Sequence, residues 1–249
     1  MAGIDKSQPL PIYYQLKEIL QQRIDSGEWQ PGDLIPSERD LCNEHAISRM
    51  TVRQAIVALV NEGRLRREQG KGTFVAQPKI EQRLGSVTSF TQDMSARGKR
   101  VESQVLRQEL ALAQPEVAAA LGLEPNEQVM VLERLRIVDG VPLALETCHL
   151  HFPGCESLSQ VDLSHQSLYN VLAHSYDLIP GQAYQQMEAT ICEPYPLRLL
   201  GLSRGSPVLL IRRTSLTQSG RPFEYTVSIY RGDKYIFHAQ LIGREEATP

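Results

Sequence analysis

The first 63 residues of the chain contain three short segments in which apolar residues recur at helical spacing. They cover about residues 11–26, 37–45 and 48–62, and a glycine or a short polar stretch follows each of them. The second segment begins with Ser37, whose hydroxyl can cap a helix while Asp40 caps it reciprocally. We expect the three helices to share one small core.

Only Ala46 and Ile47 separate the second helix from the third, and two short helices joined this closely are typical of a helix-turn-helix. In that motif the N-terminal residues of the second helix reach base edges in the major groove of DNA. Arginine can bond bidentately to guanine, and serine or threonine can bond to phosphate or contact a thymine methyl group. The residues of these types at that end are Ser48, Arg49, Thr51 and Arg53. The alternative is that they form only the solvated side of a surface helix.

Residues 65–75 follow as two extended runs around a tip that contains Gly70 and Gly72, which predicts a hairpin. A tip of low bulk that carries Lys71 suits close approach to a phosphate backbone or a minor groove, although an ordinary surface hairpin has the same pattern. The whole chain has a net charge of -3, yet residues 47–76 carry six basic and two acidic side chains. Positive charge is therefore concentrated where the chain would face DNA.

The rest of the chain contains two similar halves, about eighty residues apart. The first runs from Leu121-Gly-Leu123 through an extended run to a turn at Asp139-Gly140, and the second runs likewise from Leu200-Gly-Leu202 to Ser219-Gly220. This repetition predicts two related halves with one hairpin each, and hence a mainly antiparallel sheet covered by helices. Residues 77–84 contain a proline and show no helical or strand periodicity, so we expect them to be the interdomain linker.

Candidate ligand-binding side chains lie on these elements. Alternation along residues 131–138 points Arg134 and Arg136 to the same face of a strand, where they could clamp a phosphate or carboxylate. Ser89 lies at the start of an expected helix, whose free N–H groups attract anions. It could instead form only a capping box with Gln92.

Glu146 and Glu224 lie on corresponding strands of the two halves, and Tyr230 follows on the second. Carboxylates can accept hydrogen bonds from sugar hydroxyls or an amine, and a tyrosine adds a ring with a polar tip. The alternative is a pair of surface carboxylates and a core tyrosine, because the convergence that a binding site needs is not visible in a sequence.

Three motifs in residues 1–76 resemble the signature of the GntR family of bacterial regulators: Leu34–Leu41, Ile47–Ile56 and Gly70–Val75. The resemblance implies that residues 1–76 form a winged helix-turn-helix that binds a palindromic DNA operator as a dimer. It places the DNA-contacting positions at Arg39, Ser48, Arg49, Thr51, Arg53, Gly70, Lys71 and Gly72.

Residues 85–249 are similar to the UTRA effector-binding and dimerisation domain of the HutC subgroup, whose fold resembles that of chorismate lyase. The motifs that carry this similarity are Val87–Met94, Glu133–Arg136, Pro142–Glu146, Ser167–Tyr169 and Phe223–Asp233. Within the subgroup the chain most resembles the amino-sugar repressors of the NagR type, whose ligands are phosphorylated glucosamines. That implies a phosphate site of Ser89, Phe90, Thr91, Arg134, Arg136, Ser167 and Tyr169, and a sugar site of Glu146, Glu224 and Tyr230.

Other classes of protein receive less support from the sequence. No apolar run is long enough to span a bilayer and residues 1–8 lack the features of a signal peptide, so we expect a cytoplasmic protein with no membrane partner. The four cysteines include no CxxC pair, which argues against a disulfide framework or a structural zinc site. A metal sensor remains an alternative, and its ligands would be Cys148, His149, His151 and Cys155.

An enzyme is a further alternative, because the fold that the UTRA domain resembles includes a lyase. No Ser/His/Asp or Cys/His catalytic arrangement and no Walker-type phosphate loop is visible. We therefore expect no enzymatic activity and no cofactor. The expected helices and the mainly antiparallel sheet make the fold class α+β. The protein would be a homodimeric repressor that N-acetylglucosamine 6-phosphate or glucosamine 6-phosphate releases from double-stranded operator DNA, although activation and a different anionic effector fit the same residues.

Overall fold

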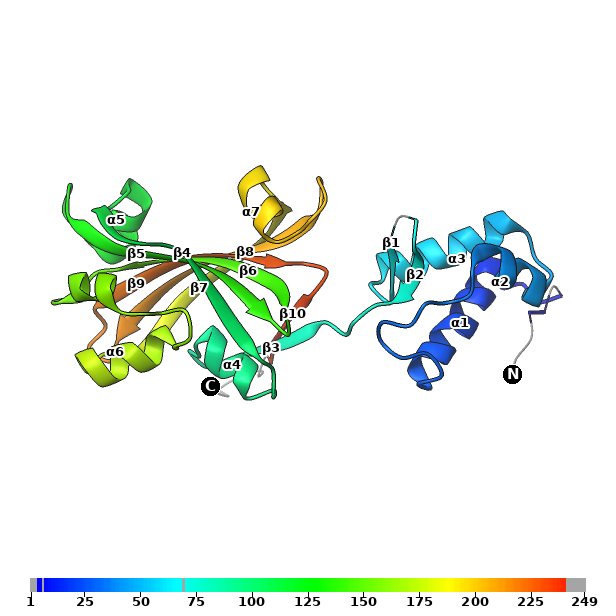
Figure 1. Cartoon of the computed structure of the whole chain (residues 1–249), viewed down its shortest axis with the longest axis horizontal. Coiled ribbons are helices and arrows are strands. Elements are labelled where there is room, and N and C mark those ends of the chain that lie inside the picture. The colour runs from blue at the N-terminus through cyan, green and yellow to red at the C-terminus, as the bar shows by residue number, and fades with distance from the viewer. Residues whose placement is uncertain (1–3, 6, 69, 241–249) are drawn as a thin grey trace, which may run out of the picture. The chain divides into compact units, whose positions relative to one another are not determined.

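The structure is a computed structural model that describes residues 4–240, with the exception of Lys6 and Gln69. The chain divides after Lys79 into two compact units (Figure 1). Residues 241–249 of the expected C-terminal domain lie outside the described residues. The first unit contains α1 (Ile12–Asp25), α2 (Glu38–His45), α3 (Arg49–Asn61), β1 (Leu65–Glu68) and β2 (Gly72–Val75).

Local hydrogen bonds explain where the helices of this unit begin and end. The Ser37 hydroxyl accepts a bond from the Asp40 N–H over 3.2 Å, and the Asp40 carboxylate accepts one from the Ser37 N–H over 3.3 Å, which confirms the capping box. Ser48 caps α3 by accepting a bond from the Thr51 N–H over 3.2 Å. Ala46 ends α2 in the left-handed conformation, with φ 51°, and so makes the sharp turn into α3. The helices and the hairpin share one core, which includes Leu16, Leu20, Leu41, Val52, Ile56, Leu59, Leu65 and Val75.

The second unit is built around a six-stranded antiparallel sheet with strand order β4-β5-β6-β9-β8-β7. Its elements are β3 (Ile80–Leu84), α4 (Phe90–Ser95), β4 (Val101–Leu112), α5 (Pro115–Leu121), β5 (Gln128–Val138), β6 (Val141–Leu150), the 3-10 helix η1 (Cys155–Gln160), α6 (Leu168–Tyr176), β7 (Pro180–Ile191), α7 (Pro194–Leu199), β8 (Pro207–Thr217), β9 (Pro222–Arg231) and β10 (Tyr235–Ala239). Figure 1 shows α5 and α7 on one face of the sheet and α4 and α6 on the other. The expected α+β fold class is confirmed.

The sheet consists of two halves with the same order of elements, as the sequence repetition predicts. The first half is β4-α5-β5-β6 and the second is β7-α7-β8-β9, and β6 and β9 pair at the centre. The first hairpin turns at Asp139 and Gly140, with φ 50° and 78°, and the second turns near Gly220, with φ 84°. Positive φ at both central residues is what a tight hairpin turn requires, and glycine adopts it without strain.

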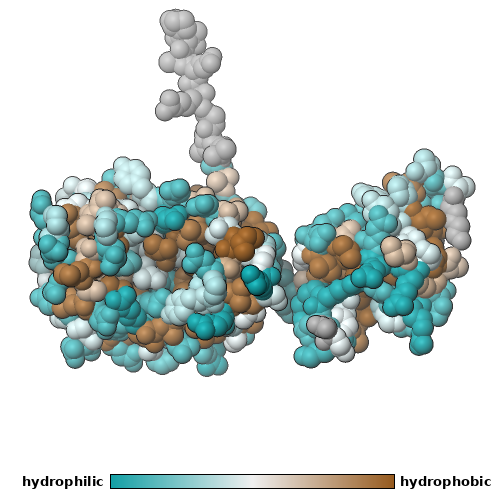
Figure 2. Space-filling view, turned by 90° about the horizontal axis from the view of Figure 1, so that it is seen from above, coloured by the Kyte–Doolittle hydropathy of each residue, from teal (hydrophilic) through white to brown (hydrophobic). Residues whose placement is uncertain are grey.

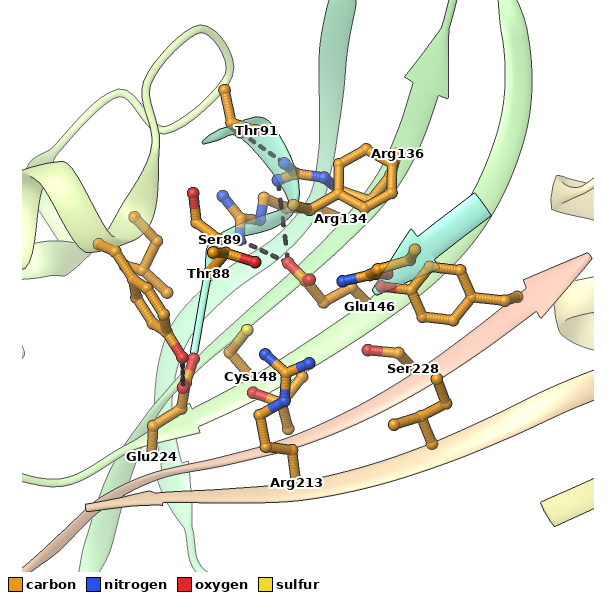
Figure 3. Close-up of a pocket in the computed structure, with 17 residues that line it drawn as sticks. Thr88, Ser89, Thr91, Arg134, Arg136, Glu146, Cys148, Arg213, Glu224 and Ser228 are labelled. Carbon is orange, nitrogen blue, oxygen red and sulfur yellow. Dashed lines mark hydrogen bonds and ion pairs between the residues drawn. The ribbon is translucent and has the colours of Figure 1, made fainter. Parts of the chain in front are cut away.

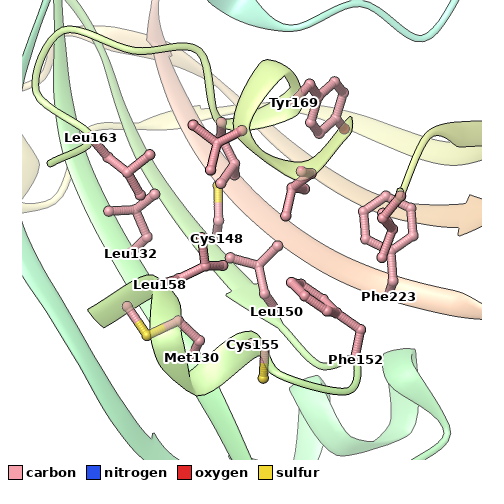
Figure 4. Close-up of a cluster of buried hydrophobic side chains, with 14 residues drawn as sticks. Met130, Leu132, Cys148, Leu150, Phe152, Cys155, Leu158, Leu163, Tyr169 and Phe223 are labelled. Carbon is pink, nitrogen blue, oxygen red and sulfur yellow. The ribbon is translucent and has the colours of Figure 1, made fainter. Parts of the chain in front are cut away.

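A large apolar cluster fixes α6 and η1 against one face of the sheet (Figure 4). Strands β5, β6 and β9 contribute Met130, Leu132, Cys148, Leu150 and Phe223, and η1 and α6 contribute Cys155, Leu158, Leu168, Tyr169 and Leu172. Because α6 is anchored through these side chains, the position of its first turn over the sheet is well determined.

The expected linker over residues 77–84 is wrong in its second part. Residues 80–84 form β3, which pairs in parallel with β10 from Ile80↔Tyr235 to Leu84↔Ala239. The sequence of this strand shows no alternation of apolar and polar residues, because its central residue, Gln82, is polar although it is buried. Its partner lies more than 150 residues further along the chain. The connection between the two units is therefore shorter than the sequence indicates.

The surface of each unit seen in Figure 2 is largely polar, with apolar residues scattered among the charged ones. Scattered apolar residues of this kind are normal for a folded domain in water. Within the described part of the chain, no helix combines the length and apolarity needed to cross a membrane.

Candidate functional site

The first candidate site is the exposed start of α3. Arg49 is the first residue of the helix and its side chain is 82% exposed, and Arg53 is exposed one turn later. Ser48 and Thr51 lie in the same turn, with their hydroxyl oxygens 2.8 Å apart. Arg39 is exposed on α2. This end of the helix therefore presents two guanidinium groups and a hydroxyl pair to the solvent.

The carboxylate of Glu38 joins the start of α3 to the hairpin. It accepts a hydrogen bond from Arg49 Nε over 3.2 Å and another from Arg67 Nη2, on β1, over 2.7 Å. Two arginines from different elements thus lie beside one carboxylate, so the start of α3 and strand β1 contribute to the same face of the unit. The sequence prediction counted Arg67 among the basic residues of this region but assigned neither Glu38 nor Arg67 to the DNA-contacting set, although Glu38 lies inside the motif Leu34–Leu41.

The tip of the hairpin contains the predicted residues Gly70, Lys71 and Gly72. Gly70 has φ 76° and Gly72 has φ 130°, values that L side chains rarely adopt. At Gly72 an added Cβ would lie 2.5 Å from Cδ1 of Leu34. The Lys71 side chain is 74% exposed, and its ammonium lies 3.3 Å from the Glu68 carboxylate. The tip is thus narrow and carries an exposed cation, the properties that close approach to a nucleic acid requires.

The second candidate site is a pocket in the second unit, between α4, α6 and the central strands of the sheet (Figure 3). Charged and polar side chains make up most of its lining. The predicted ligand residues that line it are Ser89, Phe90, Thr91, Arg134, Arg136, Glu146, Tyr169, Glu224 and Tyr230. The remaining one, Ser167, is buried and is not part of the lining, and its hydroxyl oxygen lies 3.0 Å from that of the lining residue Ser89.

Two buried arginines form the most strongly charged part of the pocket. Arg134 is 3% exposed and donates a hydrogen bond from Nη2 to Glu146 over 2.5 Å. Arg136 is 1% exposed, donates to the Thr91 hydroxyl over 2.7 Å and stacks over the Phe90 ring at 4.7 Å. In both arginines Nε and Nη1 are buried and have no hydrogen-bond partner among the described residues. Buried donors without partners are rare in folded proteins and need an explanation.

These groups remain charged near neutral pH. Burial and the neighbouring charge of Arg134 lower the pKa of Arg136 to about 10, so this guanidinium stays protonated. Burial by itself raises the pKa of the Glu146 carboxyl, but Arg134 and Arg136 hold that pKa below its ordinary value. Arg134, Arg136 and Glu146 together therefore carry two positive charges and one negative charge, so their net charge is positive.

A second network lies on the opposite side of the pocket, around Glu224. Its carboxylate accepts hydrogen bonds from the Tyr169 hydroxyl over 2.6 Å and from the Ser215 hydroxyl over 2.7 Å. Burial and the Glu224 charge raise the pKa of the Tyr169 hydroxyl, so it stays protonated and donates. This side of the pocket therefore offers both acceptors and donors to a polar ligand.

Several lining residues were missed by sequence reasoning: Gln82, Thr88, Cys148, Leu168, Ile211, Arg213, Thr226 and Ser228. Arg213 was predictable from the duplication, because it pairs with Thr226 across β8 and β9 as Arg134 pairs with Glu146 across β5 and β6. Its Nε donates to the Gln185 side chain over 2.8 Å. With Arg213 the pocket lining contains three arginines and two glutamates, so its formal charge is positive.

The alternative of a metal site finds no support in the geometry. Among the residues that the structure describes, no group of three or more histidine, cysteine and carboxylate side chains is placed to share a metal ion. Cys148 faces the pocket, and burial raises the pKa of its thiol well above the ordinary value. The neighbouring His149 has a ring nitrogen 3.3 Å from the backbone carbonyl oxygen of Tyr225.

Comparisons with known proteins match both units. The family described as bacterial regulatory proteins, gntR family, matches residues 12–75, and the UTRA domain family matches residues 96–236. The chain is 42% identical over 238 residues to the HTH-type transcriptional repressor NagR of Bacillus subtilis, an alignment that covers 94% of this chain and 96% of NagR. It is 36% identical over 213 residues to the histidine utilization repressor of Pseudomonas putida, covering 86% of this chain and 84% of that protein.

Solved structures support the same assignment. The crystal structure of PhnF from Mycobacterium smegmatis is similar with a TM-score of 0.64 and 29% identity, and the match covers 92% of this chain and 99% of PhnF. This family consists of transcription regulators and not of enzymes. The chain belongs to the GntR family of bacterial regulatory proteins, in the HutC subfamily with a UTRA domain, and it is a DNA-binding transcription regulator.

Proposed function

We propose that this regulator is a repressor that leaves a two-fold operator when its pocket binds an amino-sugar phosphate, either glucosamine 6-phosphate or N-acetylglucosamine 6-phosphate. The observation that carries the proposal is the set of unpartnered donors on Arg134 and Arg136 inside a pocket with a positive lining. The 42% identity to a repressor, NagR, over nearly the whole chain supports the direction of regulation.

A phosphate group suits the Arg134 side of the pocket. A phosphate monoester carries about -1.5 to -2 charges near pH 7 and has three strongly accepting oxygens. Planar guanidinium groups bind such oxygens in pairs. The donors of that kind are Nε and Nη1 of Arg134 and Nε of Arg136, whereas Arg136 Nη1 already lies 3.8 Å from the Glu146 carboxylate. The hydroxyls of Ser89 and Thr91 lie in the same wall of the pocket and can donate further bonds. A bound phosphate would thus balance the excess positive charge and give the free donors their partners.

The sugar would then lie toward Glu224. The carboxylates of Glu146 and Glu224 accept hydrogen bonds, whereas the ring of Tyr230 lies at the other end of the pocket, level with Arg136. An amino sugar offers several hydroxyl donors and, in glucosamine, a cationic amine that a buried carboxylate favours. The pocket is therefore suited to a ligand that is anionic at one end and rich in donors at the other.

The DNA-binding half of the proposal rests on the exposed start of α3. We assign base contacts to Arg49 and Arg53, phosphate contacts to Arg39, Ser48, Thr51 and Lys71, and close approach of the backbone to Gly70 and Gly72. Arginine in the major groove reads guanine, whereas lysine and hydroxyl groups mainly position the protein on the backbone.

We expect either sugar phosphate to weaken operator binding by about 5- to 150-fold, the usual size of coupling between two sites. The operator can be selected from a random pool of duplexes by the purified protein, and its affinity measured by fluorescence anisotropy. Inorganic phosphate and glucose 6-phosphate serve as controls, because they test the charge and the sugar ring without the amino group. Unchanged operator affinity with both amino-sugar phosphates would exclude them as effectors and leave the DNA-binding assignment intact.

A two-fold operator requires a second copy of the chain, and we infer that this copy docks along β7. This strand is at one edge of the sheet, is unpaired on its outer side among the described strands, and contains a single charged residue, Glu188. Its Tyr184, Met187 and Ile191 are 68%, 41% and 59% exposed. Free edge strands are usually protected by charges, as the opposite edge strand β4 is, so an unprotected edge is typical of a pairing surface.

Placing lysine at both Tyr184 and Met187 is expected to convert the dimer into a monomer, because like charges would meet across the two-fold axis. Light scattering of the purified protein measures the molar mass. The matched control places lysine at Leu110 and Leu112, which are 41% and 55% exposed on β4. If the protein stayed dimeric after the β7 changes and became monomeric after the β4 changes, the dimer interface would lie at β4 and not at β7.

A further inference from the structure

One residue of the pocket lies on the strand that follows the DNA-binding unit. Gln82 is on β3, three residues after the end of that unit at Lys79. The other lining residues lie on α4 and the segment before it, on α6, or on strands β5, β6, β8 and β9. A ligand that touches Gln82 therefore touches the part of the pocket nearest along the chain to the helix-turn-helix.

The side-chain amide of Gln82 is available for a ligand. The residue is 7% exposed, and among the described residues no hydrogen bond to its amide is formed. A primary amide offers two N–H donors and a carbonyl acceptor, and a sugar hydroxyl can satisfy either kind. A ligand in the pocket can therefore form a hydrogen bond with this amide.

The strand that carries Gln82 has one strand partner among the described strands, and its Ile80 packs against the apolar cluster that contains Phe90 and Tyr230. That partner is β10, and the pair is separate from the six-stranded sheet. The Ile80 N–H donates to the Lys234 carbonyl over 2.7 Å, and Tyr235 of β10 packs on Tyr230 of the pocket wall with ring centroids 4.7 Å apart. A two-stranded pair has little stability of its own. Its position therefore depends on what packs against it, including the contents of the pocket.

We propose that Gln82 couples effector binding to DNA release. Its amide hydrogen-bonds a hydroxyl of the bound sugar phosphate, and this bond holds β3 in a position that the operator-bound dimer does not allow. A ligand shifts such an equilibrium only by its differential affinity for the two states, and the Gln82 contact supplies that difference. The inference rests on the proposed function, because it needs an effector in this pocket.

The test replaces Gln82 with methionine, which keeps the length and the burial of the side chain and removes its amide. Arg83→Met is the matched control, because Arg83 is the next residue of β3 and is exposed. Calorimetry gives the Kd of each protein for glucosamine 6-phosphate. Operator affinity is then measured without effector and with effector at a concentration that is the same multiple of each protein's own Kd. In this way weaker effector binding is not mistaken for weaker coupling.

We expect the effector to weaken operator binding by about 5- to 150-fold in the wild type and in Arg83→Met, and by less than about threefold in Gln82→Met. An undiminished effect in Gln82→Met would overturn the coupling role. So would a folded Gln82→Met protein that no longer binds the effector, since Gln82 would then be needed for affinity. If the wild type binds neither amino-sugar phosphate, the proposed effector is wrong and this inference falls with it.

Discussion

Arg134→Ala is expected to weaken effector binding by about 2–5 kcal/mol, a factor of roughly 30 to 4000 in Kd, and to leave operator binding in the absence of effector close to the wild-type value. Arg134 combines an ion pair to Glu146 with two buried donors that have no partner among the described residues. Its removal takes away a cation from the phosphate end of the pocket and leaves Glu146 to repel the anion. Calorimetry with glucosamine 6-phosphate and anisotropy with operator DNA measure the two quantities separately.

The same change should also destabilise the second unit, by about 3–5 kcal/mol, because it leaves the Glu146 carboxylate buried beside Arg136 alone. The double variant Arg134→Met, Glu146→Leu removes both charges and keeps the volume but leaves Arg136 buried without a carboxylate, so it should recover only part of the stability and none of the effector binding. Arg100→Ala is the control for the loss of a surface arginine, because the Arg100 side chain is 82% exposed. An Arg134→Ala protein that responds normally to the effector would show that this guanidinium has no part in the site.

The stability difference should depend on pH in a defined direction. In the wild type the lowered pKa of Glu146 stabilises the fold above the ordinary glutamate pKa of about 4.3, and this contribution is lost as the pH falls through the folded-state pKa. In Arg134→Ala the carboxyl loses the partner that keeps it ionised, so its pKa rises. The deficit relative to the wild type should therefore shrink as the pH falls toward 4.3 and below. Urea denaturation at several pH values measures this.

Features that depend on short stretches of sequence were predictable. Ser37 and Ser48 cap their helices as the sequence indicates, because a cap is a contact within one turn. Arg134 and Arg136 face the same pocket because side chains alternate along a strand. The eighty-residue repetition correctly indicates two equivalent halves, because each half forms its own hairpin.

Features that depend on distant partners were not predictable in the same way. Residues 80–84 are a strand only because β10 lies beside them, and nothing in their own composition indicates that partner. Gln82 is a pocket residue for the same reason. Glu38 bridges Arg49 and Arg67 only when α2, α3 and the hairpin have packed together. Arg213 is the exception, because the duplication relates it to Arg134 and could have identified it.

Arg53→Ala is expected to weaken operator binding by about 1–3 kcal/mol, a factor of roughly 5 to 150 in Kd, and to relax the base preference at one position of each half-site. Arg53 is exposed one turn into α3 and forms no ion pair with a described residue, so its guanidinium is free to reach guanine O6 and N7. Arg49 lies one turn earlier and donates a hydrogen bond to Glu38, which orients it. The measurement is the operator Kd together with the sequence preference of the variant in a random duplex pool.

Lys71→Ala is the informative comparison, because it separates recognition of bases from attraction to phosphate. The Lys71 ammonium is exposed at the hairpin tip, and its loss should weaken binding by a similar factor for every sequence and lower the slope of log K against log salt by about one per half-site. Arg53→Ala should instead lower the ratio of specific to non-specific affinity. If Arg53→Ala weakened all duplexes equally and kept the wild-type base preference, Arg53 would be a phosphate contact, and base recognition would fall to Arg49 and its neighbours.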